Sequence, residues 1–366
     1  MIWQHYNPVK IYGGKNVFSF LPSYVENKAT LLVTTAGMIK RETAKEIINI
    51  MPSARCLVQT VMPNPDIDVL DNLICQLRQE KIEVIIALGG GSVIDSAKAL
   101  SAALACNENW SLSQYLRENE SHKLHKALPL YCIPTTAGTG AEVTSFATIW
   151  DNAHMKKHSL EDPLLYPKAV FLSPELTLSL PRKETLWSAL DALSHSMETL
   201  WNKSATIIGQ LMAREAIKLL CTFLSHTQIN LSDLVAREKL QQASCLAGIA
   251  ISQSHTAIAH AISYPLTIHL GIPHGLACSF TLSALIELVD GKNLWRCVED
   301  QQLAYTVAEF MNELSLNKDL LEFCEVENIY ALASKMCTSK RASNFIIESN
   351  EINILDILQK SLSGCC

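Results

Sequence analysis

An aspartate and three histidines in the second half of the chain are spaced so that they could bind one cation. Asp191 and His195 stand four residues apart, which places both side chains on one face of a helix. His260 lies in an apolar helical stretch, where an imidazole without a partner is costly, and His274 stands at a loop-to-helix junction. One carboxylate and three imidazoles suit Fe²⁺ or Zn²⁺, so this set predicts a metal that acts as a Lewis acid.

His255 and the cysteines fit this metal set less well. His255 precedes His260 by five residues, a spacing that does not put two side chains on the same helix face, so we interpret it as structural or as support for the ligands. The twelve cysteines include no Cys-x-x-Cys pair, the usual signal of a thiolate zinc site. We expect the ten that are scattered singly to be buried free thiols, which suit a reducing compartment, and the Cys365-Cys366 pair to be an exposed tail.

A glycine-rich turn in the first half could hold a phosphate group. Gly89, Gly90 and Gly91 follow an apolar run of strand length and open a helix. Without Cβ atoms the backbone can approach a phosphate closely, the helix N-terminus directs N–H groups at it, and Ser92 could add a hydroxyl donor. The alternative is a turn that binds nothing, since the pattern is neither Gly-x-Gly-x-x-Gly nor a P-loop.

A second loop of small residues, Pro134–Glu142, follows a later strand. Its threonines Thr135, Thr136 and Thr139 could donate hydrogen bonds to a ribose or a phosphate. Two such loops in one parallel sheet favour a shared ligand, because ligands of these folds bind beyond the carboxyl ends of the strands. A dinucleotide is the ligand that would use both loops.

The elements that must position these residues change character near Pro181. Before it, strands expected at 30–35, 54–61, 84–88, 128–133 and 169–172 alternate with helices such as 40–49 and 67–80. This alternation predicts an α/β fold with a parallel sheet covered by helices on both faces. Beyond it, apolar residues recur at helical spacing. We therefore predict a dinucleotide-binding α/β domain at 1–181 and an all-α, metal-binding domain at 182–366.

Composition excludes several classes of protein. Of the 366 residues, 48% are hydrophobic and 18% charged, which is typical of a folded chain, and the net charge of −6 argues against a nucleic-acid-binding surface. No run reaches the roughly 18 apolar residues of a membrane span, and the first residues lack the basic and apolar segments of a signal peptide. We expect a cytoplasmic protein that binds neither nucleic acid nor membrane.

In this order and combination, the motifs resemble the iron-containing (group III) alcohol dehydrogenase family over nearly the whole chain. The resemblance is carried by Pro63-Asn64-Pro65, the two small-residue loops, Asp191–His195, His260 and Pro273-His274-Gly275. It implies a Rossmann-like N-terminal domain, a C-terminal helical domain, Fe²⁺ or Zn²⁺, NADPH or NADH, and a homodimer.

The resemblance also implies roles for individual residues. The metal ligands would be Asp191, His195, His260 and His274, and Lys157 matches a lysine near the nicotinamide. The cofactor-binding residues would be Thr35, Asn64, Gly89, Gly90, Gly91, Ser92, Asp95, Thr135, Thr136, Thr139 and Leu176.

Three positions depart from the family pattern. Many members hold the adenosine ribose with an aspartate where this chain has Thr35, and without that charge a 2′-phosphate is not repelled. We therefore favour use of NADPH, although Thr35 could instead only loosen the selectivity. Tyr264 replaces a histidine often assigned to proton relay; a phenol beside a cation can donate a proton, so Tyr264 is a candidate catalytic residue, but it could equally serve packing. Ala141, where serine is common, removes one cofactor contact.

The resemblance implies reduction of a small aldehyde to an alcohol, in which the metal polarises the carbonyl and NAD(P)H delivers hydride. The stretch 260–267 is similar to the family branch that reduces phosphonoacetaldehyde to 2-hydroxyethylphosphonate. A dianionic substrate needs cationic or donor groups, for which Lys157 with His158 and Arg341 with Asn344 are candidates unless they are ordinary surface residues. Maleylacetate or a plain short-chain aldehyde is the alternative substrate.

Three other classes of function explain the sequence less well. A dehydroquinate-synthase-like lyase also uses NAD and a metal, but its ligands include a glutamate in place of the Asp191–His195 pair. A metal hydrolase leaves both small-residue loops without a role, and a non-catalytic nucleotide-binding protein leaves the histidines unexplained. Hydride transfer uses both sets of residues.

Overall fold

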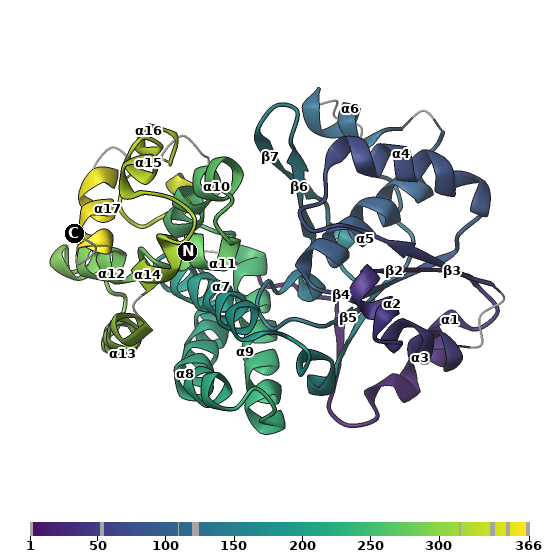
Figure 1. The fold of residues 1–366 in the computed structure, drawn as a ribbon, viewed down its shortest axis with the longest axis horizontal. Coiled ribbons are helices and arrows are strands. Elements are labelled where there is room, and N and C mark those ends of the chain that lie inside the picture. Colours follow the sequence, from purple (N-terminus) through teal and green to yellow (C-terminus); the bar gives the residue numbers. More distant parts are fainter. Residues whose placement is uncertain are drawn as a thin grey trace. The chain divides into compact units, whose positions relative to one another are not determined.

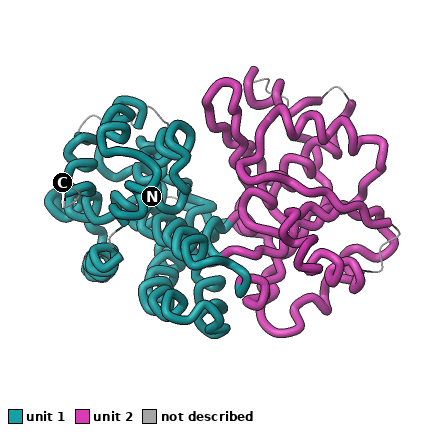
Figure 2. Tube along the Cα trace, viewed as in Figure 1, with its two compact units in different colours: residues 1–6, 137–140, 178–366 teal, residues 7–136, 141–177 magenta. Residues whose placement is uncertain are grey.

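The computed structural model describes residues 3–51, 55–108, 110–118, 124–314, 316–336, 341–348 and 352–363. Figure 2 shows that the chain divides into two compact units. The α/β unit comprises residues 7–136 and 141–177, and the helical unit comprises 1–6, 137–140 and 178–366. The predicted fold class is confirmed. The two small segments 1–6 and 137–140, which the sequence placed with the first domain, belong to the helical unit.

The α/β unit is built on a parallel sheet of six strands in the order β1-β8-β5-β4-β2-β3. The central strands are buried along their whole length because helices cover both faces, and they are correspondingly rich in valine, isoleucine and leucine. The strands of the sheet are β1 (Lys10–Gly13), β2 (Ala29–Thr34), β3 (Arg55–Thr60), β4 (Val84–Gly89), β5 (Leu130–Pro134) and β8 (Ala169–Leu172).

Figure 1 shows one group of helices on each face of this sheet. The helices α1, α2 and α3 pack on one face, and α4 and α5 pack on the other. Their bounds are α1 (Pro22–Val25), α2 (Ala36–Lys40), α3 (Thr43–Asn49), α4 (Ile67–Leu77), α5 (Gly91–Ala105) and α6 (Leu112–Arg117), with 3₁₀ turns η1 (Val17–Phe20), η2 (Arg78–Glu80), η3 (Ala141–Val143), η4 (Pro163–Leu165) and η5 (Pro174–Thr177).

The order of the strands creates a topological switch point between β2 and β4. From β2 the chain moves outward to β3, then returns to the other side of β2 to form β4 and continues away through β5. Since right-handed crossovers then place helices on opposite faces, the carboxyl ends of β2 and β4 open a crevice that suits a ligand. Thr35 follows β2 and Gly90 follows β4, so the fold places both predicted cofactor residues at this point.

A two-stranded antiparallel hairpin, β6 (Phe146–Asp151) and β7 (Lys156–Glu161), extends the α/β unit. The buried Asp151 accepts two hydrogen bonds of 2.9 Å from Arg117 on α6, and the same guanidinium binds Asp68 on α4 at 2.8 Å. The Arg117 hydrogen bonds hold the pKa of the Asp151 carboxyl well below its usual range. One arginine therefore ties the hairpin to two helices.

The helical unit has a continuous apolar core to which nearly all its helices contribute. The long helices α7, α8 and α9 pack along one another, and α10 and α11 pack against α7 (Figure 1). The helices are α7 (Arg182–Leu200), α8 (Ile207–Ile229), α9 (Leu234–Ser254), α10 (Ile258–Leu270), α11 (His274–Ser279), α12 (Leu282–Gly291), α13 (Val298–Leu314), α14 (Leu316–Leu320), α15 (Val326–Tyr330), α16 (Ala333–Met336), η6 (Ala342–Asn344) and α17 (Ile354–Leu362).

Two glycines allow backbone segments to approach α7 closely. A Cβ on Gly275 would lie 1.8 Å from the carbonyl oxygen of Trp187, and a Cβ on Gly138 would lie 2.2 Å from that of Ser188. Neither distance is sterically possible, so only glycine fits at either position. Gly275 therefore sets how near α11 comes to α7. Gly138 serves packing of the loop 137–140, a role that the sequence interpretation did not assign to it.

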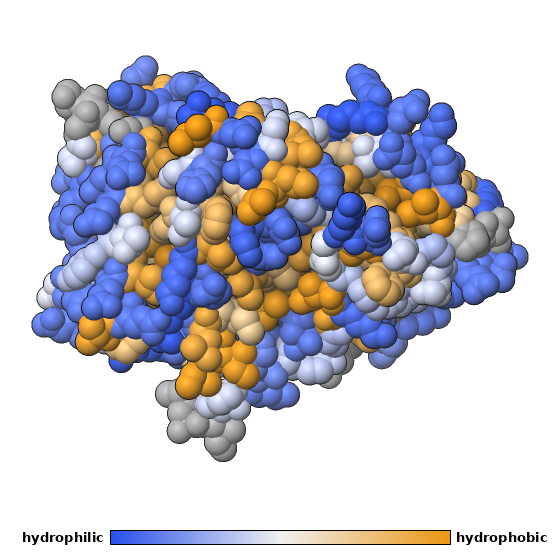
Figure 3. Space-filling view, turned by 90° about the horizontal axis from the view of Figure 1, so that it is seen from below, coloured by the Kyte–Doolittle hydropathy of each residue, from blue (hydrophilic) through white to orange (hydrophobic). Residues whose placement is uncertain are grey.

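On the face shown in Figure 3, apolar side chains are interrupted by polar ones. The most exposed large hydrophobic residues lie on separate elements and include Met62, Val69, Ile229 and Val298. Among the described residues, no helix is both long enough and apolar enough to cross a membrane.

The Arg117 hydrogen bonds predict a specific loss of stability. We expect Arg117→Met to lower the free energy of unfolding by about 2–3 kcal/mol at pH 7, because it leaves the buried Asp151 charge without its donor. A carboxyl with a depressed folded-state pKa contributes stability above the unfolded value of about 3.9, and loses that contribution as the pH falls towards the folded value. The difference between variant and wild type should therefore shrink below pH 4 in urea titrations.

The matched control is Arg55→Met, which removes a solvent-exposed pair with Glu80. That change should alter the unfolding free energy by less than about 0.5 kcal/mol. Equal effects of the two substitutions would contradict the role given to Arg117.

Candidate functional site

The helical unit brings the four predicted metal ligands together. Asp191 and His195 project from one face of α7, His260 comes from α10, and His274 is the first residue of α11. The Nε2 atoms of His195, His260 and His274 lie 3.6, 3.4 and 3.9 Å from Asp191 Oδ1. The side chain of His274 is 31% exposed while that of Asp191 is 5% exposed, so the cluster is open on the His274 side.

These residues fit a divalent ion. Oxygen and nitrogen ligands that share one tetrahedral ion at ~2.0–2.1 Å lie about 3.3 Å apart, close to the separations measured here. The Nε2 atom of the buried His260 has no hydrogen-bond partner within the described parts of the chain. A donor set of one carboxylate and three imidazoles suits Fe²⁺ and Zn²⁺ better than Ca²⁺.

Glu198 is a residue of this site that the sequence interpretation missed. It is fully buried on α7, and its carboxylate accepts hydrogen bonds from His260 Nδ1 at 2.8 Å, from the His260 backbone N–H at 3.1 Å and from the Ala257 N–H at 2.8 Å. The bond from Nδ1 fixes the ring and directs Nε2 at Asp191. Its position three residues after His195 was the signal that could have identified it.

Burial and the imidazoles compete in setting the charges of the cluster. Burial opposes the charged form of Asp191, but His195, His260 and His274 outweigh it and hold the pKa of the carboxyl well below its usual range. Glu198 behaves in the same way, since burial raises its pKa and His260 more than reverses that effect. Conversely, burial disfavours protonated His260, yet Glu198 and Asp191 raise its pKa above the usual value. The carboxylates are therefore negatively charged and favour a cation among them.

Cys278 also lies at the cluster. It is a buried free thiol on α11, as expected of the cysteines, but its Sγ lies 3.5 Å from Asp191 Oδ1. The ligand atoms of Asp191, His260, His274 and Cys278 all lie within 4.8 Å of one another. The description of the cysteines as small hydrophobic residues is therefore incomplete for this one.

Tyr264 and Arg341 line up beside the same cluster. The Tyr264 ring stacks on the His274 ring, with centroids 6.1 Å apart, and meets the His260 ring edge-on at 6.4 Å. The Arg341 guanidinium lies over the Tyr264 ring at 5.0 Å and donates to Thr256 Oγ1 at 3.1 Å. Asn344 Nδ2 donates to the Thr256 carbonyl oxygen at 2.9 Å. Two of the predicted substrate-binding residues thus lie together near the metal residues.

His255 is not one of the four predicted metal ligands, and the structure gives it a backbone role. It ends α9 with φ 60° and ψ 170°, a conformation that is strained for any residue but glycine. Its carbonyl oxygen accepts a hydrogen bond of 3.0 Å from Asn202 Nδ2. This turn reverses the chain just before Thr256 and α10.

In the α/β unit the glycine-rich turn opens helix α5 without a side-chain cap. Gly90 is the N-cap of α5 and supplies no side-chain cap, so the first N–H groups of this helix have no side-chain acceptor there. Ser92 Oγ accepts a hydrogen bond of 3.1 Å from the Asn64 N–H, which joins the Pro-Asn-Pro segment to the turn. The Thr135 N–H donates to the Gly89 carbonyl oxygen at 3.1 Å, and Thr136 faces Gly90.

The remaining predicted cofactor residues are distributed over both units. Thr35 caps α2 through its hydroxyl, and Leu176 packs beside the apolar core on the α1–α3 face. Thr139 belongs to the helical unit. Asp95 accepts a hydrogen bond of 3.0 Å from the Thr148 N–H, and burial raises its pKa to about 6 against the opposing charge of Lys98.

Lys157 and His158 lie on opposite faces of the β6–β7 hairpin. Lys157 pairs with Trp150 and its Nζ lies 5.4 Å from the Trp150 ring centroid. His158 faces the other way, with Nε2 at 3.7 Å from Asp151. They therefore cannot form one wall of a substrate site together, and Lys157 is the one whose positive charge contributes to lowering the pKa of Asp95, a predicted cofactor residue.

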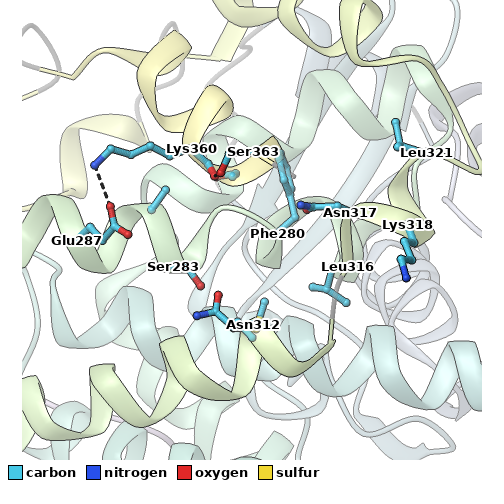
Figure 4. Close-up of a pocket in the computed structure, with 13 residues that line it drawn as sticks. Phe280, Ser283, Glu287, Asn312, Leu316, Asn317, Lys318, Leu321, Lys360 and Ser363 are labelled. Carbon is cyan, nitrogen blue, oxygen red and sulfur yellow. Dashed lines mark hydrogen bonds and ion pairs between the residues drawn. The ribbon is translucent and has the colours of Figure 1, made fainter. Parts of the chain in front are cut away.

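Two cavities in the described part of the chain differ in whether predicted site residues line them. A cavity of about 640 Å³ in the helical unit is lined by Ser283, Asn312, Asn317 and Lys360 among others, and contains none of the predicted site residues (Figure 4). A cavity of about 490 Å³ in the α/β unit includes Asn64 and Ser96. Only the second adjoins a predicted cofactor residue.

Comparison with known proteins gives one family for both units. The family profile described as iron-containing alcohol dehydrogenase matches residues 8–174, and the profile of the C-terminal part of the Fe-containing alcohol dehydrogenase family matches residues 185–362. The chain is 39% identical to the phosphonoacetaldehyde reductase of Streptomyces viridochromogenes over 215 residues, 58% of this chain and 54% of that protein. It thus spans only about half the length of that relative.

Two sulfoacetaldehyde reductases are also similar. The enzyme of Bilophila wadsworthia is 30% identical over 286 residues, 76% of this chain and 73% of that protein. The crystal structure of the enzyme from Bifidobacterium kashiwanohense in complex with NAD⁺ superposes with a TM-score of 0.87 at 28% identity, over 99% of this chain and 98% of that one.

The hydrogen bonds of Glu198 predict its effect on metal binding. In Glu198→Gln the amide group must turn an N–H towards another donor, so His260 is no longer held in place. We expect the affinity for Fe²⁺ or Zn²⁺ to fall about 10–100-fold, as for other residues that support metal ligands. Glu309→Gln, an exposed change on α13, is the control. Unaltered metal affinity in calorimetric titrations of Glu198→Gln would remove the role assigned to this carboxylate.

Proposed function

The chain belongs to the iron-containing alcohol dehydrogenase family, and we propose that it is a metal-dependent, NAD(P)H-linked reductase that converts phosphonoacetaldehyde to 2-hydroxyethylphosphonate. Hydride transfer is supported by the presence of both a metal-type cluster and two loops suited to a dinucleotide. The substrate is supported by an arginine close to the metal residues and by the 39% identity to a phosphonoacetaldehyde reductase.

Four residues would hold the metal: Asp191, His195, His260 and His274. A divalent ion bound there supplies a Lewis acid for the aldehyde oxygen, and NAD(P)H supplies the hydride. The chain's own contribution is to fix the donors before the substrate arrives, since Glu198 orients His260 and the helix α7 sets the spacing of Asp191 and His195. The exposed edge of His274 leaves the aldehyde a way in.

The coenzyme would bind at the switch point of the sheet. The N-terminus of α5 would hold the pyrophosphate, together with Asn64, Ser92, Thr135 and Thr136 around that turn. Thr35 after β2 carries no negative charge, so NADPH is accepted as well as NADH. Lys157, on the Asp95 side of its hairpin, would interact with the nicotinamide end.

Tyr264 would donate the proton that completes the alcohol. This proposal is supported by the stacking of its ring on the ring of His274, one of the proposed metal ligands. A histidine is the usual residue at this position in the family, and a phenol close to a divalent cation can serve the same purpose.

Arg341 would bind the phosphonate group. Arg341 is half-buried, its guanidinium carbon lies 5.0 Å from the centroid of the Tyr264 ring, and one of its N–H groups donates to Thr256 Oγ1 at 3.1 Å. A guanidinium in a fixed plane can donate two parallel hydrogen bonds to a tetrahedral oxyanion.

A sulfonate would satisfy the same arginine. The relatives named sulfoacetaldehyde reductase make sulfoacetaldehyde the second candidate substrate. A plain short-chain aldehyde or maleylacetate would not use Arg341 in this way, and a lyase of the dehydroquinate synthase type would not use the Asp191–His195 pair.

Substrate preference is tested by following NADPH oxidation in the Fe²⁺-loaded enzyme. We expect phosphonoacetaldehyde to be reduced with a higher kcat/KM than sulfoacetaldehyde or propanal. Arg341→Met should raise the KM for phosphonoacetaldehyde about 10–100-fold, because it removes hydrogen bonds to a charged group, and should leave propanal reduction within about threefold. Arg182→Met, at a surface arginine bonded to Gln228, is the control. If the wild type prefers propanal, the proposed anion-binding role of Arg341 is contradicted, while the proposed metal-dependent reductase activity is not.

Replacement of Tyr264 by phenylalanine tests the proton donor. We expect kcat to fall about 100-fold or more across the pH range, with metal content and the KM for coenzyme unchanged, because the ring stays and only the hydroxyl is lost. Tyr305→Phe on α13 should have no effect. Near-normal turnover of Tyr264→Phe at every pH would assign Tyr264 to packing.

A further inference from the structure

The metal cluster contains one more potential donor than the four residues considered so far. Cys278 stands four residues after His274 on α11, so both side chains lie on the same face of that helix. It is completely buried, yet its sulfur faces polar atoms: Asp191 Oδ1 and the Gly275 carbonyl oxygen each lie 3.5 Å from Sγ. The contact with Gly275 is the usual one with the third preceding residue of the same helix, and the contact with Asp191 is the one that brings the sulfur to the metal residues.

The separations are those expected of ligands that share one ion. A sulfur at ~2.3 Å and an oxygen at ~2.0 Å from one tetrahedral Zn²⁺ lie about 3.5 Å apart. Sγ and Asp191 Oδ1 have this separation, and one ring nitrogen each of His260 and His274 lies within 4.8 Å of the ligand atoms of both residues. Three residues, Asp191, His260 and His274, are thus common to two possible sets of four.

The two sets differ in their fourth member. His195 Nε2 lies 3.6 Å from Asp191 Oδ1, and its ring stacks on the His260 ring with centroids 4.7 Å apart. Cys278 approaches Asp191 from another helix, α11, and it is the residue that completes the compact group within 4.8 Å. An imidazole and a thiol therefore compete for the remaining position around Asp191 Oδ1.

We propose that Cys278 is a ligand for Zn²⁺ and other thiophilic ions at this centre, together with Asp191, His260 and His274, while Fe²⁺ is held by His195 in its place. Thiolate sulfur favours Zn²⁺ over Fe²⁺, whereas an all-nitrogen and oxygen set discriminates less between them. When the metal–sulfur bond forms, the S–H bond breaks and its proton leaves to the solvent; no electron is transferred. The identity of the bound ion thus determines whether Cys278 or His195 is the fourth ligand.

This arrangement has a consequence for activity. Zn²⁺ in structural sites is four-coordinate, so four protein donors leave it no position for substrate, whereas Fe²⁺ accepts more than four ligands and keeps a position open beside four protein donors. The Zn²⁺-loaded protein is then stable but poorly active. The inference rests on the metal centre of the proposed function and is independent of the substrate.

The test uses Co²⁺ as a spectroscopic substitute for Zn²⁺ in the full-length protein. We expect the Co²⁺-loaded wild type to show a near-ultraviolet sulfur-to-cobalt charge-transfer band. The band should disappear in Cys278→Ser, which still binds Co²⁺, and remain in the control Cys221→Ser on α8. A competition titration should show that Cys278→Ser weakens Zn²⁺ binding about 10–100-fold and Fe²⁺ binding by less than about threefold.

Other outcomes overturn the inference in distinguishable ways. Bound Co²⁺ without the charge-transfer band means that Cys278 only donates a hydrogen bond to Asp191. If Cys278→Ser weakens the binding of Zn²⁺ and of Fe²⁺ equally, Cys278 likewise is not a zinc ligand. If Cys278→Ser does not fold, X-ray absorption of the Zn²⁺-loaded wild type decides instead, since a sulfur neighbour at ~2.3 Å is either present or absent. Failure of the wild type to bind any of the three ions contradicts the metal centre itself, and with it the proposed function.

Discussion

The charge on one buried carboxylate, Asp191, governs the arrangement of the helical unit. A carboxylate removed from water must be compensated, and three imidazoles from α7, α10 and α11 lie around its Oδ1 atom. The helices can converge on that point because Gly275 lets α11 reach the backbone of α7. A second buried carboxylate, Glu198, then fixes His260 from behind. The close packing of these helices and the cation-binding character of the cluster therefore both follow from the need to compensate the buried charge of Asp191.

The α/β unit is organised around a different feature, a helix N-terminus at the switch point of its sheet. Its strand order reverses between β2 and β4, and the glycine turn after β4 opens α5 at that place. The buried Lys98 on α5 donates to Thr144 and to the carbonyl oxygen of Phe146. Helix α5 is therefore anchored to the start of β6. The turn is thereby held in position by a side chain two turns further along the same helix.

Much of this could be predicted from the sequence because it depends on local spacing. The offset of four between Asp191 and His195, the apolar strands and the glycine turn are periodic or contiguous signals, and they gave the fold class and the metal cluster. Glu198, Cys278 and the packing role of Gly138 depend on contacts between residues far apart in sequence. The β6–β7 hairpin was missed because its second strand, Lys156–Glu161, is mostly polar and lacks the apolar alternation of a half-buried strand.

Charge also bears on which substrate suits the site. Asp191 and Glu198 are both ionised in the buried cluster, so a divalent ion brings their summed charge only to neutrality. A dianionic substrate would then gain little attraction from the cluster alone. Arg341, set over the ring of Tyr264 and bonded to Thr256, adds the positive charge that such a substrate needs. A neutral aldehyde gains nothing from a half-buried arginine whose desolvation costs free energy, so the placement of Arg341 favours a substrate with an anionic end.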